Sequence, residues 1–245
     1  MDNEKIKEEQ INIKDLIRLY EKKKEKYKGE AYRHISELFI EVKGLHESKF
    51  KKKYGENGEH EQSWKSFKGK NLEKLIEYII KDEVNNLGLE IINGNILERK
   101  NGTNLDEKLG KVKRNILVDF GKFGSYMPDV DMIIFNPENS NIIAIISSKT
   151  TLRERIAQTG YWKIKLSSDV LTKHIKVYFI TPDEDGTLTN RKTPKKGRAI
   201  VETDLDGSYV LSETNIEESD KVKMFDKFID DLKNIIKNNL SFNDK

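Results

Sequence analysis

The chain has 245 residues, with 45 Lys and Arg against 42 Asp and Glu, 36% hydrophobic residues and no cysteine. This length suits one large domain or two small ones. Without cysteine there is no disulfide framework, thiolate nucleophile or cysteine-based metal site, and four scattered histidines form no zinc-binding helix pattern. The opening MDNEKIKEEQ is no signal sequence and there is no run of 18 apolar residues, so we expect a soluble, cytoplasmic protein without a membrane partner.

The total charge does not indicate a partner. A formal net charge of +3 with a mean hydropathy of −0.73 is typical of many solvated, Lys- and Glu-rich proteins. Any case for nucleic acid therefore depends on where the charges lie along the chain.

Residues 1–60 are predicted to form a helical arm, because apolar residues recur at roughly helical spacing in 6–20 and again in 35–45. A basic helix end at 49–54 precedes the loop-like sequence GENGEHEQ. The arm either caps the main domain or helps to grip a partner chain or DNA.

Residues 61–245 are predicted to form the main domain, which opens with a helix over 69–88 that Gly88 ends. Strands rich in Ile and Val are expected to follow, then a helix, a further strand, a hairpin and a terminal amphipathic helix. The strands are expected at 89–97, 115–120, 130–135, 142–147 and 175–180, the helices at 151–166 and 221–240, and the hairpin at 199–211. The turn cluster at 136–141 suits an antiparallel hairpin. Nearly continuous apolar runs indicate an α/β fold, with a mixed central sheet covered by helices.

Candidate catalytic residues lie at the ends of two neighbouring strands. Pro128-Asp129-Val130-Asp131 opens one strand, and Ser147-Ser148-Lys149 closes the next. A hairpin would bring a carboxylate and an ammonium together. That pair suits Mg²⁺-dependent phosphodiester hydrolysis, because the acid holds the metal and the lysine positions or helps to deprotonate the attacking water.

On these residues the chain resembles the PD-(D/E)XK nuclease family, and residues from about 69 to 180 match the helix, three strands, helix and strand of its core. Pro128, Asp129 and Lys149 keep the motif, whereas Ser147 stands where the common motif has Asp or Glu. A hydroxyl cannot supply the second metal-binding charge, so another carboxylate is needed.

Two acids are candidates for that second charge. Glu73 lies on the helix where several restriction endonucleases of this family carry a metal-associated glutamate, and it is the preferred one. Asp131 is ranked second, because residues two apart on a strand share a face but Asp131 would lie deeper. The alternatives are a solvated helix residue for Glu73 and a polar group at the strand end for Asp131. The resemblance thus implies Asp129 and Glu73 as metal ligands.

The segment after Lys149 reads TTLRERIAQTGYWK. An SxK motif followed by this string resembles the branch of restriction endonucleases in which R-(D/E)-R reads CCGG, CCNGG or CCWGG sites. This resemblance implies that Arg153, Glu154 and Arg155 read adjacent C·G pairs, as Arg with guanine and a carboxylate with cytosine can. Where some of that branch carry a further glutamate, 161–163 have no acid. The alternatives are a charged helix face for the trio and sheet packing for Tyr161 and Trp162.

A basic stretch at 191–198 contains five cations in eight residues and is predicted to be a loop or hairpin tip. Its cations are the candidate phosphate contacts Arg191, Lys192, Lys195, Lys196 and Arg198. The alternative is a solvated loop. Residues 63–70 also mix basic and aromatic side chains, which suit either DNA contact or, for Trp64 and Phe67, the core.

The sequence lacks a phosphate-binding loop, a nucleophile elbow and a nucleotide-binding glycine fingerprint, so no nucleotide cofactor is expected. We therefore predict a type II restriction endonuclease that uses Mg²⁺ to cut both strands of a palindromic double-stranded DNA site. A palindrome implies a homodimer. The alternatives are a structure-directed repair or junction nuclease with the same core, and a DNA-binding module on a decayed nuclease core.

Overall fold

The computed structural model describes residues 11–55, 59–99 and 105–243. A six-stranded mixed sheet forms its centre, in the order β1-β4-β5-β6-β7-β8. The strands are β1 (Glu90–Asn93), β4 (Met132–Phe135), β5 (Ile142–Ser148), β6 (Lys176–Thr181), β7 (Gly207–Val210) and β8 (Val222–Met224). β1, β4 and β5 pair antiparallel, and β5 to β8 pair parallel. The predicted mixed α/β sheet is confirmed.

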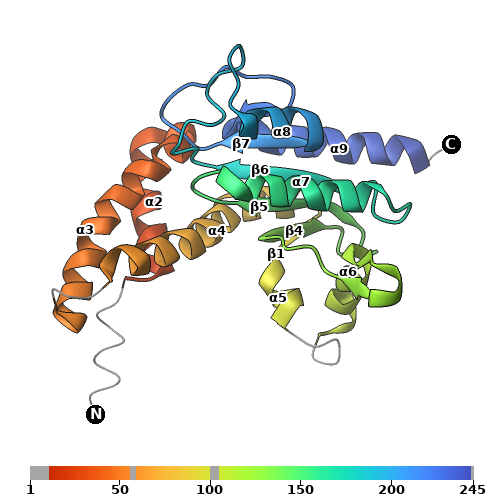
Figure 1. Cartoon of the computed structure of the whole chain (residues 1–245), viewed down its shortest axis with the longest axis horizontal. Helices are drawn as coiled ribbons and strands as arrows, with labels where there is room; N and C mark the ends of the chain where they lie inside the picture. Colours follow the sequence, from red (N-terminus) through yellow and green to blue (C-terminus); the bar gives the residue numbers. More distant parts are fainter. Residues whose placement is uncertain (1–10, 56–58, 100–104, 244–245) are drawn as a thin grey trace.

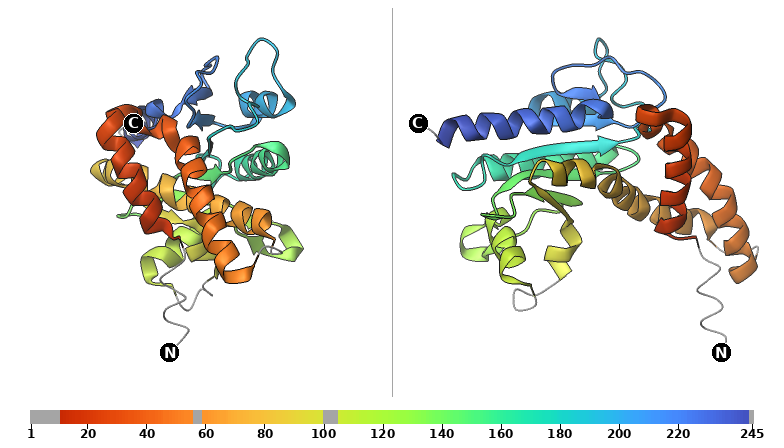
Figure 2. Two further views of the ribbon diagram at one scale, coloured as in Figure 1. Left: turned by 90° about the vertical axis from the view of Figure 1, so that its left-hand side faces the viewer. Right: turned by 180° about the vertical axis from the view of Figure 1, so that it is seen from behind.

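Helices cover both faces of this sheet (Figures 1 and 2). α7 (Arg153–Ser167) and α8 (Lys196–Asp204) lie on one face, while α4 (His60–Asn86) and α9 (Phe228–Asn243) lie on the other. Strands β4, β5 and β6 are almost wholly buried, as expected for strands covered on both sides.

The N-terminal arm consists of α2 (Ile13–Tyr27), the 3-10 helix η1 (Lys28–His34) and α3 (Ile35–Tyr54). It projects to one side of the sheet and packs on α4 (Figure 1). An Asn12–Asp15 capping box starts α2. Buried side chains of the arm, including Leu16 and Leu38, belong to the same hydrophobic cluster as those of the sheet. The helices predicted for the described part of the arm are present; Ile6 lies outside the described residues.

Several predicted elements are wrong in extent or type. The strand expected at 89–97 stops at Asn93, where the Asn93 side chain accepts from the backbone of Asn95 and α5 (Gly94–Arg99) begins. Residues 199–204, expected in the hairpin at 199–211, belong instead to α8, whose inward face buries Arg198 and Val201. β8 occupies the start of the predicted terminal helix, and the 3-10 helix η4 (Phe225–Lys227) then leads into α9.

The strand expected at 115–120 is present only as the two residues 118–119, because residues 115 and 116 still belong to a helix. Asp106 accepts a hydrogen bond from Leu109 N and caps α6 (Glu107–Ile116), which buries Val112 and Ile116 one turn apart. A small hairpin follows, made of β2 (Val118–Asp119), the 3-10 helix η3 (Gly121–Phe123) and β3 (Ser125–Tyr126). It precedes the predicted PD motif.

The predicted hairpin at 136–141 is present. Asn136 N donates to Asn141 O at 2.9 Å, and Ser140 N donates to Asn136 O at 2.8 Å. This turn makes β4 and β5 antiparallel with Met132 opposite Ile146, and so brings the start of β4 beside the end of β5. No helix in the described part of the chain is both long and apolar enough to span a membrane.

Candidate active site

Asp131 and Lys149 lie side by side at the tips of β4 and β5. Asp131 immediately precedes β4, and its backbone N donates to Ile146 O at 3.1 Å. Lys149 immediately follows β5. The register that pairs Met132 with Ile146 puts Asp131 opposite Ser147, and Lys149 lies two residues beyond Ser147, within diagonal reach of Asp131. The local hairpin therefore places a carboxylate against an ammonium.

Three charged side chains form the centre of the site. Lys149 Nζ donates to Asp131 Oδ1 at 2.8 Å and to Glu73 Oε1 at 3.0 Å. The Lys149, Glu73 and Asp131 side chains are 27%, 14% and 11% exposed, so water screens the contacts only in part. Buried Leu72 and Ile76 fix this face of α4. Ser148 N donates to Asp131 Oδ2 at 2.6 Å and fixes its carboxylate.

The electrostatics of this cluster keep Lys149 charged. Burial lowers the pKa of Lys149, but the Asp131 and Glu73 carboxylates outweigh this effect and hold the pKa above its usual value. Burial, and then the neighbouring Asp131 charge, raise the pKa of Glu73. In this state Lys149 is an ammonium at neutral pH, which suits charge compensation at a phosphate rather than proton abstraction.

Asp129 does not take the position that its place in the motif predicts. Its carboxylate is exposed and accepts from Gln158 Nε2 at 2.7 Å, and the described contacts include none between Asp129 and Lys149. The contact expected of Asp129 is made instead by Asp131, the acid ranked second. Two contacts account for this: Ser148 N donates to the Asp131 carboxylate directly before β4, whereas Gln158 holds the Asp129 carboxylate two residues outside the strand. Ser147 is buried and lines the same small pocket as both aspartates.

The predicted base-reading element forms the first turn of α7. Arg155 lines the pocket together with Asp129 and Lys149, and its Nη1 donates to Gln158 Oε1 at 3.0 Å. The side chains of Arg153 and Glu154 lie outside the described residues. The structure thus places the third residue of the trio next to the charged cluster.

Further along α7, Tyr161 and Trp162 lie in different environments. Trp162 packs on the core near Phe120, as the sheet-packing alternative expects, whereas Tyr161 is 44% exposed.

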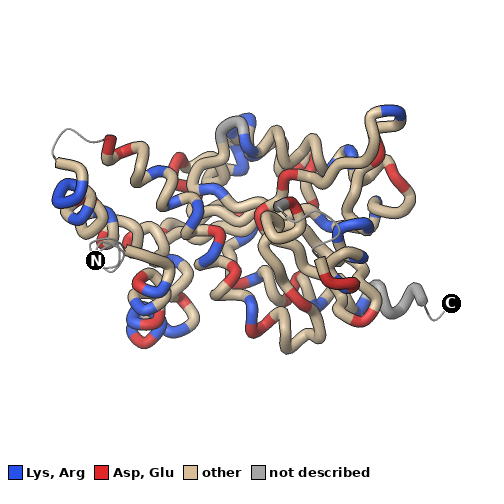
Figure 3. The backbone as a smooth tube through the Cα atoms, turned by 90° about the horizontal axis from the view of Figure 1, so that it is seen from below, with Lys and Arg blue, Asp and Glu red and all other residues tan. Residues whose placement is uncertain are grey.

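The basic stretch at 191–198 contains both surface and buried cations. Arg191, Lys192, Lys195 and Lys196 are exposed, on the loop before α8 and at its start. Arg198 is wholly buried, so its prediction as a phosphate contact is wrong. Cations and carboxylates are interspersed along the whole chain rather than separated onto one side (Figure 3).

Arg198 instead joins three segments. Its guanidinium donates to the carbonyls of Leu188 and Glu217 and lies 3.2 Å from Glu202 Oε1. The helical spacing of α8 turns this residue inward with Val201.

The mixed basic and aromatic segment at 63–70 is part of α4. Trp64 is buried and packs on Phe39 and Phe67, so the core alternative holds for Trp64. Lys68 pairs with Glu184 and links α4 to the loop after β6.

The donor set around Lys149 fits a divalent oxygen-seeking cation. Glu73 and Asp131 converge from two different elements on one ammonium, and the two carboxylates exceed its charge by one. Mg²⁺ is commonly held by one or two carboxylates and keeps the rest of its shell for water and substrate phosphate.

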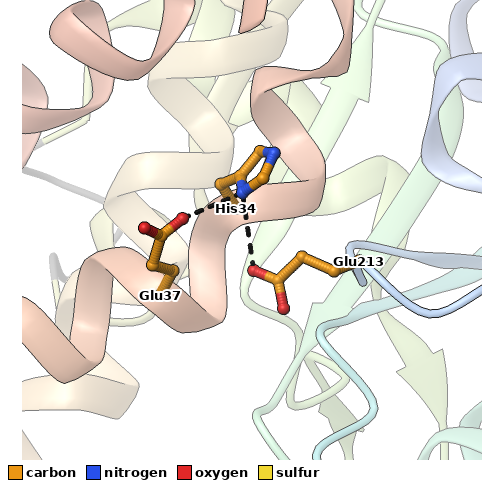
Figure 4. Close-up of side chains that lie close together, drawn as sticks. All are labelled: His34, Glu37 and Glu213. Carbon is orange, nitrogen blue, oxygen red and sulfur yellow. Dashed lines mark hydrogen bonds and ion pairs between the residues drawn. The ribbon is translucent and has the colours of Figure 1, made fainter.

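A second possible ligand group lies between the arm and the sheet domain. Atoms of His34, Glu37 and Glu213 lie within 4.8 Å of one another (Figure 4). His34 Nδ1 is 2.9 Å from Glu37 Oε2 and 3.8 Å from Glu213 Oε1. Lys23 Nζ already pairs with Glu37 at 3.1 Å and Glu41 at 2.8 Å. The group therefore acts as a polar link between α3 and the segment after β7.

The sequence analysis did not single out Gln158, and it placed Asp131 second to Glu73. The apolar run Met132–Phe135 directly after Asp131 marks Asp131 as the residue that precedes the strand. Gln158 carried a weaker signal: it stands one turn after Arg155 on a predicted helix. Its contact with Asp129 needs the tertiary structure.

A mixed sheet with a carboxylate–lysine cluster at the tips of an antiparallel strand pair defines a nuclease of the PD-(D/E)XK class. The family model "BsaWI restriction endonuclease type 2" matches residues 108–231. The putative type II restriction enzyme MjaVIP of Methanocaldococcus jannaschii is 40% identical over 181 residues, which cover 72% of this chain and 78% of that protein. The chain belongs to this family and is a type II restriction endonuclease.

Two solved structures have the same fold at low sequence identity. The AgeI–DNA complex has a TM-score of 0.54 at 14% identity and covers 84% of each chain. The PspGI–substrate DNA complex has a TM-score of 0.52 at 16% identity and covers 84% of this chain and 80% of that one. The predicted restriction-endonuclease fold is thus confirmed.

Proposed function

We propose that this enzyme uses Mg²⁺ to hydrolyse both strands of a short palindromic double-stranded DNA site with a C·G-rich core. The observation that carries the proposal is the convergence of Glu73 and Asp131 on Lys149, next to Arg155. Double-stranded DNA as the ligand is supported by the fold shared with two proteins whose structures contain DNA.

Each member of the cluster has a separate task. Glu73 and Asp131 would hold the metal, which when bound activates water and polarises the scissile phosphate. The Lys149 ammonium offsets the charge that develops on the phosphate oxygens and orients the attacking water. Ser147, buried beside them, shapes the pocket and lacks the charge that the common motif has at this place.

Base reading is assigned to the start of α7. Arg153 and Arg155 would donate to guanine O6 and N7, and Glu154 would accept from the cytosine amino group. The exposed cations Arg191, Lys192, Lys195 and Lys196 would contact phosphates without reading sequence. The support is position, since Arg155 shares the pocket with Lys149.

A homodimer follows from the symmetry of the proposed site. A palindrome presents the same half-site twice, and two copies of one chain related by a twofold axis read both halves with the same residues. Sedimentation of the protein with and without a duplex that contains the site measures this directly. A complex of one chain per duplex that still cuts both strands at once would contradict it.

The central experiment is digestion of a plasmid of known sequence with Mg²⁺, followed by sequencing of the fragment ends. Discrete bands with a common palindrome at the ends are expected. D131N, E73Q and K149M should each lower the single-turnover rate at least 100-fold, whereas the exposed α4 variant E83Q should cut like the parent. Circular dichroism melts verify that each variant is folded. Parent protein that leaves the plasmid intact, or D131N that cuts at full rate, would refute the assignment.

The runner-up activity has a distinct outcome in the same assay. A structure-directed nuclease would cut branched or nicked substrates in preference to intact plasmid and give no common end sequence. Membership of a type II restriction endonuclease family favours discrete ends.

A further inference from the structure

A chain of three polar side chains joins the base-reading helix to the strand that carries Asp131. Arg155 Nη1 donates to Gln158 Oε1 at 3.0 Å, and Gln158 Nε2 donates to Asp129 Oδ2 at 2.7 Å. Arg155 Nη1 also lies 3.9 Å from Asp129 Oδ2. We name this set the Arg155–Gln158–Asp129 relay. All three side chains line the pocket that contains Asp131 and Lys149.

The relay has a definite orientation. The guanidinium only donates and the carboxylate only accepts, so the Gln158 amide must turn its oxygen to Arg155 and its NH₂ to Asp129. The reverse orientation would face like partial charges at both ends. Gln158 therefore transmits the position of Asp129 to Arg155.

Asp129 is a firm anchor despite its exposed side chain. Its chain neighbours Pro128 and Val130 are buried. The backbone beyond them is held from two sides, because Asp131 N donates to Ile146 O at 3.1 Å and Gly94 N donates to Asp131 O at 2.9 Å.

The geometry argues against two simpler roles for Asp129. As a metal ligand it would be expected beside Glu73 at Lys149, but the aspartate that contacts Lys149 is Asp131. As a stabilising ion pair it would be weak, because Arg155 and Asp129 are 55% and 58% exposed and pairs of this kind contribute little to stability. The remaining role for Asp129 is to set the orientation of the Arg155 guanidinium through Gln158.

Arg155 keeps donors for a base while it is held. Its hydrogen bond to Gln158 comes from Nη1 alone, whereas a guanidinium carries five N–H groups in a fixed plane. Fixing one edge of that plane sets the angle of the other edge, which is the edge that bidentate recognition of guanine requires.

We propose that Asp129 and Gln158 are positioning residues that set the Arg155 guanidinium for base reading and tie its position to the strand of Asp131. This inference rests on the proposed role of Arg155. It makes Asp129, the acid of the PD motif, a determinant of sequence discrimination instead of a metal ligand.

The test uses the full-length enzyme and its own site, found by sequencing the fragment ends. Single-turnover cleavage rates are measured on that site and on duplexes that differ by one base pair at each position. D129A and Q158L should keep cleavage and lose roughly 10-fold in discrimination at a single base pair, which is the scale of one misaligned bidentate contact. D129N, which keeps an acceptor oxygen, should restore part of the loss.

Two further readouts separate positioning from a general structural defect. The Mg²⁺ concentration for half-maximal rate should be the same in D129A and the parent. The double variant D129A/R155A should discriminate no worse than R155A alone, because both substitutions affect the same contact between Arg155 and the base. D220A, which changes an exposed carboxylate outside the pocket, is the matched control.

Each contrary outcome has its own meaning. Loss of cleavage in D129A with activity retained in D131N would make Asp129 the metal ligand and overturn the inference. Additive losses in D129A/R155A would show that Asp129 acts apart from Arg155 and would also overturn it. Full discrimination in R155A would instead refute the proposed base-reading role, and an inactive parent would refute the proposed function itself.

Discussion

Replacement of Arg198 tests whether a cation in the basic stretch serves the fold or the DNA. Its side chain is 0% exposed and donates to the buried carbonyl oxygen of Leu188 and the part-buried carbonyl oxygen of Glu217. In R198A both oxygens lose their donor, at about 1–3 kcal/mol each. Glu202 loses its ion pair but keeps the Ser219 hydroxyl, whose Oγ lies 2.7 Å from Oε1. We therefore expect the free energy of unfolding to fall by about 3–5 kcal/mol, the range for breaking a buried pair.

Equilibrium unfolding in urea measures this change, with K196A as the matched control because Lys196 is exposed on the same helix. R198M separates the two sources of instability, since it fills most of the volume but restores no hydrogen bond. If packing dominates, R198M should be nearly as stable as the parent; if the hydrogen bonds dominate, it should resemble R198A. Salt dependence of DNA binding completes the test. The structural role would be refuted if R198A were as stable as the parent and its slope of log DNA affinity against log salt concentration were smaller by about one. Arg198 would then be a phosphate contact.

Four further outcomes are expected. K195A/K196A should weaken binding to all DNA sequences and flatten the slope of log affinity against log salt; an unchanged slope removes them from the interface. G94A should lower the free energy of unfolding in urea by about 1–3 kcal/mol and slow cleavage, because its Cβ would clash with the carbonyl oxygen of Val130 next to Asp131; full stability contradicts this contact. Burial raises the pKa of Asp183 to about 6, so the free energy of unfolding should fall by about 2–3 kcal/mol between pH 4 and pH 7 relative to D183N, since the folded state binds the proton more tightly. E213Q should lower it by less than about 1 kcal/mol, as its exposed link to the arm is weak; a Zn²⁺-dependent rise in melting temperature that E213Q abolishes would indicate a metal site instead.

Local sequence signals predicted the centre of the fold well. The turn cluster between β4 and β5 and the apolar runs of β4, β5 and β6 each carry their own signal, because a buried strand is recognisable from its own residues. The prediction for the start of α8 was wrong because its structure depends on contacts with distant residues. Its residues Ala199-Ile200-Val201 favour a strand by composition, and the buried contacts of Arg198 with distant carbonyls override that preference.

The site shows the same division between local and tertiary information. The motif predicted that Lys149 and an aspartate of the PD segment share one site, and the family resemblance added Glu73; in the structure Glu73 and Asp131 both pair with Lys149. Which of Asp129 and Asp131 contacts Lys149 depends on the backbone N–H of Ser148, which donates to Asp131, and on Gln158, which holds Asp129. Neither contact is encoded in the spacing of the motif residues.

The two aspartates together suggest why recognition and cleavage can be coupled in a small pocket. Asp131 contacts Lys149, and Asp129, two residues away on the same anchored segment, contacts Gln158 on α7, the helix proposed to read bases. A shift of α7 on a wrong base pair would move Gln158 and strain this segment, because the backbone of Asp131 is fixed to Ile146 and Gly94. A poor fit between α7 and a base would then displace the Asp131 carboxylate through the backbone of residues 129–131, without movement of a domain.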